Sequence, residues 1–242
     1  MALIVFTLTL AAPIASARAE TPVCPSYVDP QITVQPTYTT PFYDSTKSVQ
    51  EIQVMSGQPD IAYAGLHNLP VGLTSSNLRL DSAFEVSTRT TSQDPTACAQ
   101  ISRFNLNFGF SDTTVYLARE LLPHSCGYET VLEHESRHVM VDQQILAAYL
   151  PQLPPLLAAK LRQTGVVHAV STEVAIEHLN NVMRNYLRDL GAVIARVRER
   201  QQQQIDTLEE YKRISRSCNG EIARMLGNEP LPPDDQLPAI IQ

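Results

Sequence analysis

The sequence predicts an α+β protein in which an N-terminal antiparallel β-rich part is followed by a helical part. Residues 24–122 are rich in Pro, Thr, Ser, Tyr and Gly, and several runs there alternate apolar with polar side chains. Both features are typical of short strands joined by turns. Over residues 126–227 the apolar residues recur at helical spacing instead. The two parts together, residues 20–228, form one expected domain that is long enough to bury a sizeable core.

Residues 1–19 have the pattern of a signal peptide for export. Their apolar run ends at Ala12, and Ala17-Arg18-Ala19 matches a small-x-small cleavage site. An apolar N-terminal helix is the alternative, but the run is too short to span a bilayer. No later segment is apolar enough for a span either, so we expect a secreted or periplasmic protein without stable membrane insertion.

The four cysteines, Cys24, Cys98, Cys126 and Cys218, all follow the predicted cleavage site. An even number of cysteines in an exported chain predicts two disulfides. Pairing Cys98 with Cys126 and Cys24 with Cys218 is one option. Pairing Cys126 with Cys218 is another, if the end of the chain folds back onto the first helix. No CxxC spacing is present, which argues against a cysteine-ligated zinc or a thioredoxin-type motif.

The predicted strands of the β-rich part are its alternating runs, residues 32–35, 49–54, 104–108 and 114–118. The last two runs are separated by residues 109–113, which include Gly, Ser and Asp. We therefore expect these two runs to form a hairpin that leads directly into the first helix.

The helical part begins with a predicted helix over residues 127–149, which prolines at positions 151, 154 and 155 end. A short helix is expected over residues 156–163. A long helix then begins at Ser171, a favourable N-cap residue, and its apolar residues keep a helical period as far as Leu208. The apolar face of this long helix is expected to pack on the first helix. The proline-rich residues 229–242 are expected to be a flexible tail.

The pattern HExxH at residues 134–138 is the strongest functional signal in the chain. His134 and His138 lie one turn apart on one face of the predicted helix, so their imidazoles can share a metal ion. Glu135 can hold the water that such an ion activates. Two surface histidines with a Glu–Arg ion pair are the alternative interpretation. The histidines, however, interrupt an apolar stripe from Val131 to Tyr149, and this context favours a metal site.

The segment around this motif, residues 126–146, resembles the zincin metallopeptidases. The resemblance implies a zincin-like fold, Zn²⁺ as the cofactor, His134 and His138 as zinc ligands, and Glu135 as the general base. It also implies a peptide or protein as the substrate. The sequence departs from the zincin pattern at Arg137, which lies inside the motif. We expect Arg137 to point to solvent or to pair with Glu133, just before the motif.

A catalytic zinc needs a third protein ligand, and acidic residues on either helix are candidates. Asp142 lies one turn beyond His138, but three ligands on one straight helix cannot easily surround a metal tetrahedrally. We therefore expect Asp142 to contact a ligand or to lie on the surface. Glu173 and Glu177 are similar in spacing to the gluzincin pattern. A helix dipole that favours acidic residues in the first turn explains Glu173 equally well.

Antiparallel packing would bring the long helix back to the level of the metal nearer residue 200 than residue 173. The C-terminal half is also similar to a poorly characterised bacterial family of exported, predicted zinc-dependent proteases. In that family a short Asp-containing motif follows the long helix, and Asp206 would match its Asp. The residues that follow Asp206 differ from the motif. Because Glu209 lies closer to the apolar stripe than Glu210, we predict Glu209 as the third ligand, with Asp206 orienting a histidine.

Other residues are weaker candidates. A lone histidine at a helix edge is more often structural than a ligand, and this applies to His168 and His178. The tyrosines near the motif or the long helix are possible oxyanion donors, namely Tyr128, Tyr149 and Tyr211.

The function that the motif and the resemblance predict is an exported zinc metalloprotease. The formal net charge of −7 argues against nucleic acid and anionic membranes as partners. Two alternatives stay open. The first is a non-enzymatic envelope protein with a structural or vestigial metal site, which a closed site or a carboxylate paired with Arg137 would favour. The second is a zinc amidase that acts on cell-wall peptides.

Overall fold

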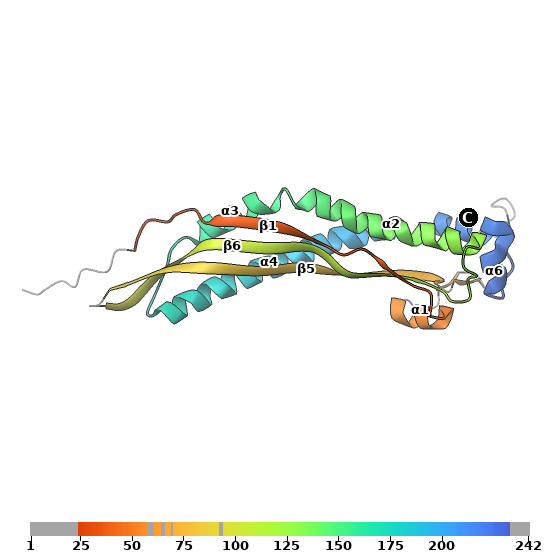
Figure 1. Cartoon of the computed structure of the whole chain (residues 1–242), viewed down its shortest axis with the longest axis horizontal. Coiled ribbons are helices and arrows are strands. Elements are labelled where there is room, and N and C mark those ends of the chain that lie inside the picture. The colour runs from red at the N-terminus through yellow and green to blue at the C-terminus, as the bar shows by residue number, and fades with distance from the viewer. Residues whose placement is uncertain (1–23, 58–60, 64–65, 69, 92–93, 233–242) are drawn as a thin grey trace, which may run out of the picture.

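The computed structural model describes residues 24–57, 61–63, 66–68, 70–91 and 94–232. The predicted signal peptide, residues 1–19, and the end of the predicted tail lie outside these ranges. The chain forms a mixed α/β structure that is strongly elongated, with a long β-hairpin running beside long helices (Figure 1).

The main sheet is organised around β6 (Asp94–Leu117), the longest strand. It pairs antiparallel with β5 (Gly72–Thr91) along almost its whole length. On its other side lie β1 (Gln31–Tyr38) and β2 (Phe42–Asp44), both parallel to β6, and β7 (Val167–Ala169), which is antiparallel. The prediction of a purely antiparallel β-rich part is therefore wrong for β1 and β2. A long connection separates β2 from β5, so β1 and β2 do not form a hairpin with the strands that follow them.

The predicted hairpin between residues 104–108 and 114–118 is also wrong, because both runs belong to β6. Gly109 is not a turn residue: a Cβ there would lie 1.8 Å from the carbonyl oxygen of Thr37, so β1 requires a glycine at this position. Asp112 and Thr113 lie opposite the single residue Ser76, and Asp112 has a φ of 55°. This is a β-bulge, which keeps the strand continuous while changing its twist. The long hairpin of the fold joins β5 to β6.

Residues 49–54, predicted as a strand, form part of helix α1 (Val49–Ser56). Ser48 and Glu51 make a reciprocal capping box, in which each side chain accepts a hydrogen bond from the other residue's backbone N–H. Gly57 ends the helix in the left-handed conformation, with a φ of 64°. Local capping therefore outweighs the alternating pattern here. The small β3 (Ile61–Tyr63) and β4 (Leu66–Asn68) follow and pair antiparallel.

The first three helices after residue 125 lie where the sequence predicts them: α2 (Cys126–Tyr149), α3 (Leu153–Thr164) and α4 (Thr172–Gln203). Ser125 and Ser171 are the N-caps of α2 and α4. The continuous helical period as far as Leu208 is not found, because α4 ends at Gln203. Thr207 then caps a new helix, and the last elements of the described residues are α5 (Leu208–Arg216), the 3₁₀ helix η1 (Ser217–Gly220) and α6 (Glu221–Met225).

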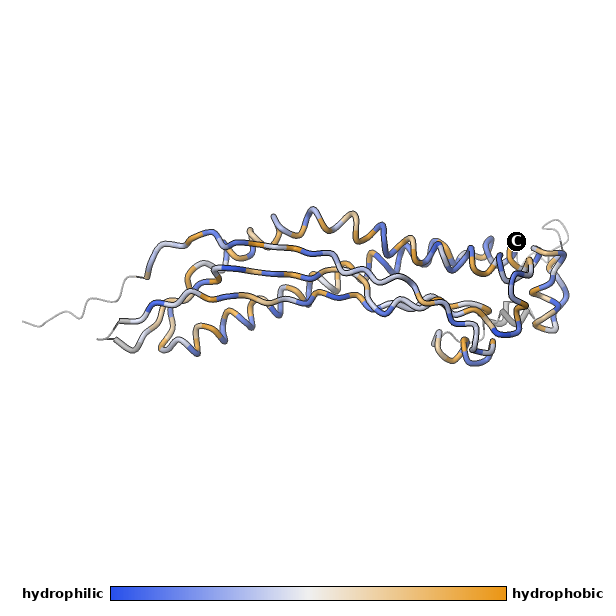
Figure 2. The backbone as a smooth tube through the Cα atoms, viewed as in Figure 1, coloured by the Kyte–Doolittle hydropathy of each residue, from blue (hydrophilic) through white to orange (hydrophobic). Residues whose placement is uncertain are grey.

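One face of the sheet carries the main core. Phe104, Leu106, Phe108 and Phe110 alternate along β6 and are buried, whereas Asn105 and Asn107 between them are exposed. Side chains of α2, α3 and α4 cover this buried face. Figure 2 shows the corresponding short alternation of hydrophobic and hydrophilic residues along strands and helices. A second cluster lies where α1, the start of β5, α2 and α6 meet, at the α6 end of the molecule (Figure 1).

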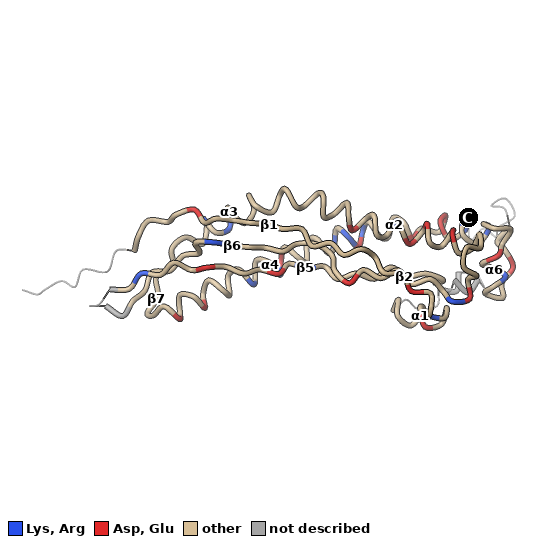
Figure 3. Tube along the Cα trace, viewed as in Figure 1, with Lys and Arg blue, Asp and Glu red and all other residues tan. Residues whose placement is uncertain are grey.

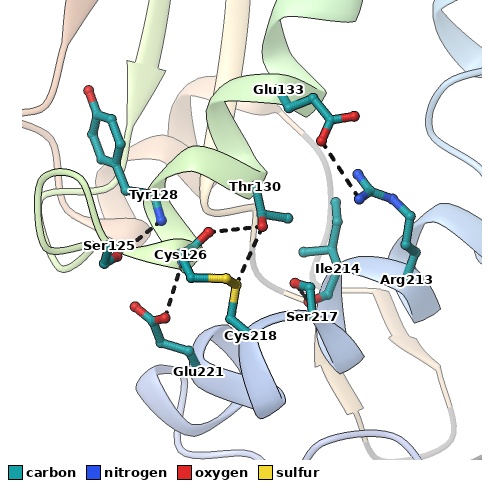
Figure 4. Close-up of a disulfide and its surroundings, with 11 residues drawn as sticks. Ser125, Cys126, Tyr128, Thr130, Glu133, Arg213, Ile214, Ser217, Cys218 and Glu221 are labelled. Atoms are coloured by element: carbon teal, nitrogen blue, oxygen red, sulfur yellow. Dashed lines mark hydrogen bonds and ion pairs between the residues drawn. A yellow bond between two sulfur atoms is a disulfide. The ribbon is translucent and has the colours of Figure 1, made fainter.

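Two disulfides fasten the ends of the described chain. Cys24 is bonded to Cys98 in β6, and Cys126 at the start of α2 is bonded to Cys218 in η1 (Figure 4). The pairing that returns the end of the chain to the motif helix is thus the one formed. Disulfides are compatible with an oxidising, exported location. Among the residues that the structure describes, no helix combines the length and apolarity needed to cross a bilayer.

Residues 229–232, the start of the predicted flexible tail, lie against α5. The backbone N–H of Leu231 donates to the hydroxyl of Ser215, at 3.3 Å, and Arg216 donates to the carbonyl oxygen of Leu231, at 3.4 Å. The C-terminal segment is therefore held in place at least as far as Pro232.

Candidate metal centre

The packing of α2 on α4 brings the acidic and amide groups of the chain's end to the HExxH motif. His138 contacts Gln202, and Asp142, one turn further along α2, contacts Arg198, one turn earlier in α4. The two helices therefore run antiparallel, as the sequence predicts. Asp206 follows the end of α4 and continues this register to the level of His134.

Three electron-pair donors converge at this point. The Nε2 atoms of His134 and His138 are 3.3 Å apart, and they lie 3.2 and 3.1 Å from Oδ1 of Asp206. Ligand atoms bound tetrahedrally at about 2.0–2.1 Å are separated by about 3.3 Å. The triangle therefore has the size that a tetrahedral metal ion requires. Both histidines are buried and Asp206 is half-buried. His134, His138 and Asp206 form a group that could hold a metal ion.

The third member of this group is Asp206 and not the predicted Glu209. The side chain of Glu209 is 73 % exposed and binds Lys212 at 3.1 Å. The prediction of Glu209 assumed that the apolar face of α4 continues through residue 208. Because the chain turns after Gln203 and α5 starts in a new direction, that face ends before Glu209. The carboxylate of Asp206, predicted to orient a histidine, points directly at both imidazoles.

The remaining candidate ligands lie elsewhere. Glu173 is at the start of α4, about 45 Å along that helix from Gln202 at the rise of an α-helix. There it accepts hydrogen bonds at the helix N-terminus, which lower its pKa. Glu177 and His178 lie one turn later on α4. His168 is in β7, opposite Cys98. None of these four residues belongs to the metal-binding group among the described residues.

The outer nitrogen of His134 is held by a buried carboxylate. Nδ1 of His134 lies 3.1 Å from Oε1 of Glu210. Arg213 donates to both oxygens of Glu210, at 2.8 and 2.9 Å, and Arg137 also pairs with Glu210. Arg137, whose side chain is 34 % exposed, therefore pairs with Glu210 and not with Glu133, which instead lies 3.9 Å from Arg213. The positive charge of Arg137, inside the motif, pairs with the negative charge of Glu210, the carboxylate that orients His134.

The outer nitrogen of His138 is held by an amide. Nδ1 of His138 contacts Oε1 of Gln202. The Gln202 amide nitrogen donates to the carbonyl oxygen of His138, at 3.2 Å, and to Oδ1 of Asp142, at 3.3 Å. These two acceptors fix the orientation of the amide, so that its oxygen faces the imidazole. Asp142 is itself buried and accepts from Arg198, at 2.6 and 3.1 Å, and from Ser76, at 2.5 Å.

The hydrogen bonds of the outer nitrogens bear on which histidine nitrogens carry protons. Nδ1 of His138 faces the amide oxygen of Gln202, so this neutral ring carries its proton on Nδ1. Nδ1 of His134 lies 3.1 Å both from Oε1 of Glu210, an acceptor, and from an Arg137 guanidinium nitrogen, a donor. With both protons on Nδ1, the two Nε2 lone pairs face each other and Oδ1 of Asp206. Three lone-pair donors within 3.3 Å repel one another unless a cation lies between them. Doubly protonated rings would instead place two buried positive charges with centroids 5.0 Å apart, which is also unfavourable.

Electrostatics within the group are consistent with an ionised carboxylate beside two imidazoles. Burial raises the pKa of Asp206, but when the rings of His134 and His138 are protonated on Nε2, their hydrogen bonds and charges outweigh burial and hold this pKa well below its ordinary range. Burial lowers the pKa of the His138 imidazole, but Asp206 and Glu135 outweigh that effect and raise it. The site therefore stabilises positive charge at its centre.

Glu135 lies beside this group, against the first residues of β5. The hydroxyl of Thr74 donates to its carboxylate, at 2.8 Å, and is 3.1 Å from its backbone oxygen. A Cβ at Gly72 would lie 2.5 Å from Oε1 of Glu135, so only glycine leaves room for this carboxylate. Burial raises the pKa of Glu135, although the two histidines and Thr74 act in the opposite direction. A carboxylate that holds a proton more readily is suited to general acid–base work.

A cavity of about 240 Å³ opens next to the group, and His134, Glu135, His138 and Asp206 form part of its wall. Tyr211 lines the same cavity, and burial followed by the charges of Asp206 and Glu135 raises the pKa of its phenol. The other tyrosine candidates, Tyr128 and Tyr149, do not line it. Figure 3 shows charged residues gathered toward the α6 end, around α2 and the C-terminal helices, whereas β1 and β6 carry few.

Several residues of the site were not identifiable from the sequence pattern. Gly72, Thr74 and Ser76 come from β5, far from the motif in sequence, and no local signal marks them. Gln202 lies in a run of four glutamines with nothing to distinguish it. Thr207 followed by Glu210 is a helix-start signal that could have placed the end of α4 before Asp206.

Comparison of the chain with protein-family models, curated proteins and solved structures gave no match. The remaining evidence on function is therefore the site itself. A second group of potential ligands among the described residues, Cys126, Cys218 and Glu221, consists of a disulfide and a carboxylate that accepts from the backbone N–H of Gly127. It has no free thiolate to offer a metal.

Proposed function

We propose that this protein is an exported zinc-dependent metalloprotease that hydrolyses peptide bonds. One observation carries the proposal: His134, His138 and Asp206 converge at tetrahedral spacing, with Glu135 beside them in the wall of an accessible cavity. Two imidazoles and one carboxylate form a ligand set that suits zinc. Three protein ligands leave the fourth position for water or substrate, which is typical of catalytic rather than structural zinc sites.

When bound, zinc would act as a Lewis acid that polarises the scissile carbonyl and lowers the pKa of a bound water toward neutrality. The residues of the chain account for the proton transfers. Glu135 accepts one proton from the water as its oxygen bonds to the carbonyl carbon. As the C–N bond breaks, Glu135 delivers that proton to the leaving nitrogen, giving an amine and a carboxylic acid. The hydroxyl of Tyr211 can donate to the oxygen that gains negative charge.

A structural metal site in a non-enzymatic envelope protein is the second candidate. The observation that favours it is the ion pair between Arg137 and a buried carboxylate, Glu210. Glu210, however, contacts the outer nitrogen of His134 and is not one of the three converging groups. The cavity also keeps the group open on one side. The proposal of an enzyme therefore accounts for more of the site.

Metal content tests the first part of the proposal. Purified protein should contain about one equivalent of zinc by mass spectrometry, and the double variant His134→Ala/His138→Ala should contain almost none. A similar zinc content in parent and variant would rule out this group as the metal site.

The variant Glu135→Gln tests the hydrolytic step. It should retain zinc and lose activity by about 10²–10⁴-fold, the usual contribution of a general acid–base residue. Glu133→Gln is the matched control, because Glu133 is a neighbouring glutamate that lies 66 % exposed outside the group, and it should cleave like the parent. Cleavage is measured on a peptide library and on purified cell wall. Activity on cell wall alone would favour the amidase, whereas zinc binding without cleavage of either would favour the structural site.

A further inference from the structure

Many of the residues that line the cavity beside the metal-binding group are aliphatic, although Ser56, Ser215, Asn228 and Glu229 also line it. The aliphatic wall of the cavity is built from Val71, Leu73, Val131, Ile214, Ile222 and Leu226. Val71, Val131 and Ile222 are buried members of the second hydrophobic cluster, and Leu73, Ile214 and Leu226 pack against it only partly buried. A substrate that reaches the metal-binding group therefore also meets a surface of aliphatic side chains.

Two charged residues line the cavity besides the metal-binding group and Glu135. Arg198 is bound to Asp142 at 2.6 Å, and Glu229 is exposed to solvent. The charge of Arg198 is therefore compensated, and no free cation among the described lining residues could bind an anionic side chain. An apolar cavity of about 150 Å³ is enough to bind benzene, and this one has about 240 Å³.

We propose that this aliphatic wall is a specificity pocket that binds a branched aliphatic or aromatic side chain next to the bond that is cleaved. The inference rests on the proposed function, since it assigns a side-chain preference to the same site. It identifies the substrates as peptides or proteins with an apolar residue beside the scissile bond. Anionic side chains at that position would lose their hydration without finding a partner.

The pocket depends on the C-terminal segment, because α5 and α6 contribute residues to its wall. Ile214 follows the turn that carries Asp206, and Ile222 and Leu226 follow η1, which the Cys126–Cys218 disulfide fastens to the start of α2. Figure 4 shows Ile214 beside this disulfide and the first turns of α2. The same segment thus supplies a metal-binding carboxylate and the apolar wall.

The test measures binding of small hydroxamates to the zinc-loaded protein by calorimetry. Acetohydroxamate, which carries only a methyl group, reports chelation alone. We expect 4-methylpentanohydroxamate and 3-phenylpropanohydroxamate to bind on the order of 10- to 100-fold more tightly, the gain that burial of such a side chain provides. Succinic monohydroxamate, with a negative charge in the same place, should gain nothing over acetohydroxamate.

The outcomes separate this inference from the proposed function. Equal affinity for all four hydroxamates would overturn the specificity pocket and leave the metal site standing. Tightest binding of the charged hydroxamate would overturn it as well. If zinc is not retained, or if acetohydroxamate does not bind, the proposed function fails together with the inference.

Variants of the aliphatic wall residues test whether this wall causes the gain in hydroxamate affinity. Leu226→Lys should abolish most of the gain for the two apolar hydroxamates while acetohydroxamate binds as before, and that unchanged value verifies folding and zinc loading. Leu122→Lys is the matched control, because Leu122 is 72 % exposed and does not line the cavity. Should Leu226→Lys not fold, Ile214→Ala removes wall area by truncation and should reduce the gain for 4-methylpentanohydroxamate. An unchanged gain in a folded wall variant would contradict the proposal.

Discussion

Asp206 is the residue on which the composition of the proposed metal site depends. Its Oδ1 lies within 3.2 Å of both histidine Nε2 atoms. The variant Asp206→Asn keeps the shape of the side chain but removes its charge, so zinc affinity should fall by about 100-fold or more, beyond the 10- to 100-fold typical of residues that only orient a ligand. Competition with a fluorescent chelator measures it. Glu209→Gln, the matched exposed acid, should leave zinc affinity unchanged; a larger loss there than in Asp206→Asn would restore Glu209 as the ligand.

At this scale the sequence could identify the part of the site that is local. His134, Glu135 and His138 lie within one stretch of helix, and helical geometry alone places the two imidazoles on one face. The third carboxylate depends on where α4 ends and how the chain turns, and a shift of three residues exchanges a half-buried position for an exposed one. That turn follows from the cap at Thr207, a weak local signal next to the strong apolar period of α4.

Between elements, Asp142 joins the sheet and the two long helices. It lies on α2, accepts from Arg198 and Gln202 of α4, and also accepts from Ser76 of β5. Ser76 lies opposite the β-bulge of β6, a local irregularity of the kind that re-aims side chains near functional sites. Because Gln202 also contacts His138, this network connects the packing of the elements to the geometry of the metal-binding group.

Removal of Arg198 should therefore destabilise the fold. Arg198→Met leaves the buried carboxylate of Asp142 without its cation, which typically costs about 3 kcal/mol or more. Urea unfolding with a metal chelator present measures this loss separately from zinc binding. Arg196→Met is the control, because Arg196 is exposed on the same helix, and its effect should stay within about 0.5 kcal/mol. Equal losses in the two variants would show that the Asp142 pair contributes nothing to stability.

The elements themselves were predictable where caps and prolines agree with the hydrophobic period, as for α2 and α4. Elements were not predictable where two local sequence signals compete. Residues 49–54 alternate like a strand, but the Ser48–Glu51 capping box and Gly57 make them helix α1. The run at residues 109–113 has the composition of a turn, but glycine is there to let β1 approach the backbone of β6. Pairings between distant strands and the close approach of two backbones are not visible in a local pattern.

For the molecule as a whole, the site lies at one end of an elongated fold (Figure 1). The main core lies between the sheet and helices α2, α3 and α4, and the residues of the candidate site gather where the end of the chain returns to α2. The sequence indicated this return only as one of two disulfide pairings. The choice between them depends on the path of α5 and η1, which no local pattern determines.

The two disulfides should therefore differ in effect although they close loops of similar length, with sequence separations of 74 and 92. Loop entropy gives each about 4.5 kcal/mol of stability, so replacing either pair with serine should lower the unfolding free energy to a similar extent. Only Cys126→Ser/Cys218→Ser should also weaken zinc binding, by about 10-fold or more, because it frees the segment that holds Glu210 against His134. In Cys24→Ser/Cys98→Ser, whose disulfide lies on β6 away from the site, zinc affinity should match the parent. Equal zinc affinity in both folded variants would mean that α5 is held without the disulfide.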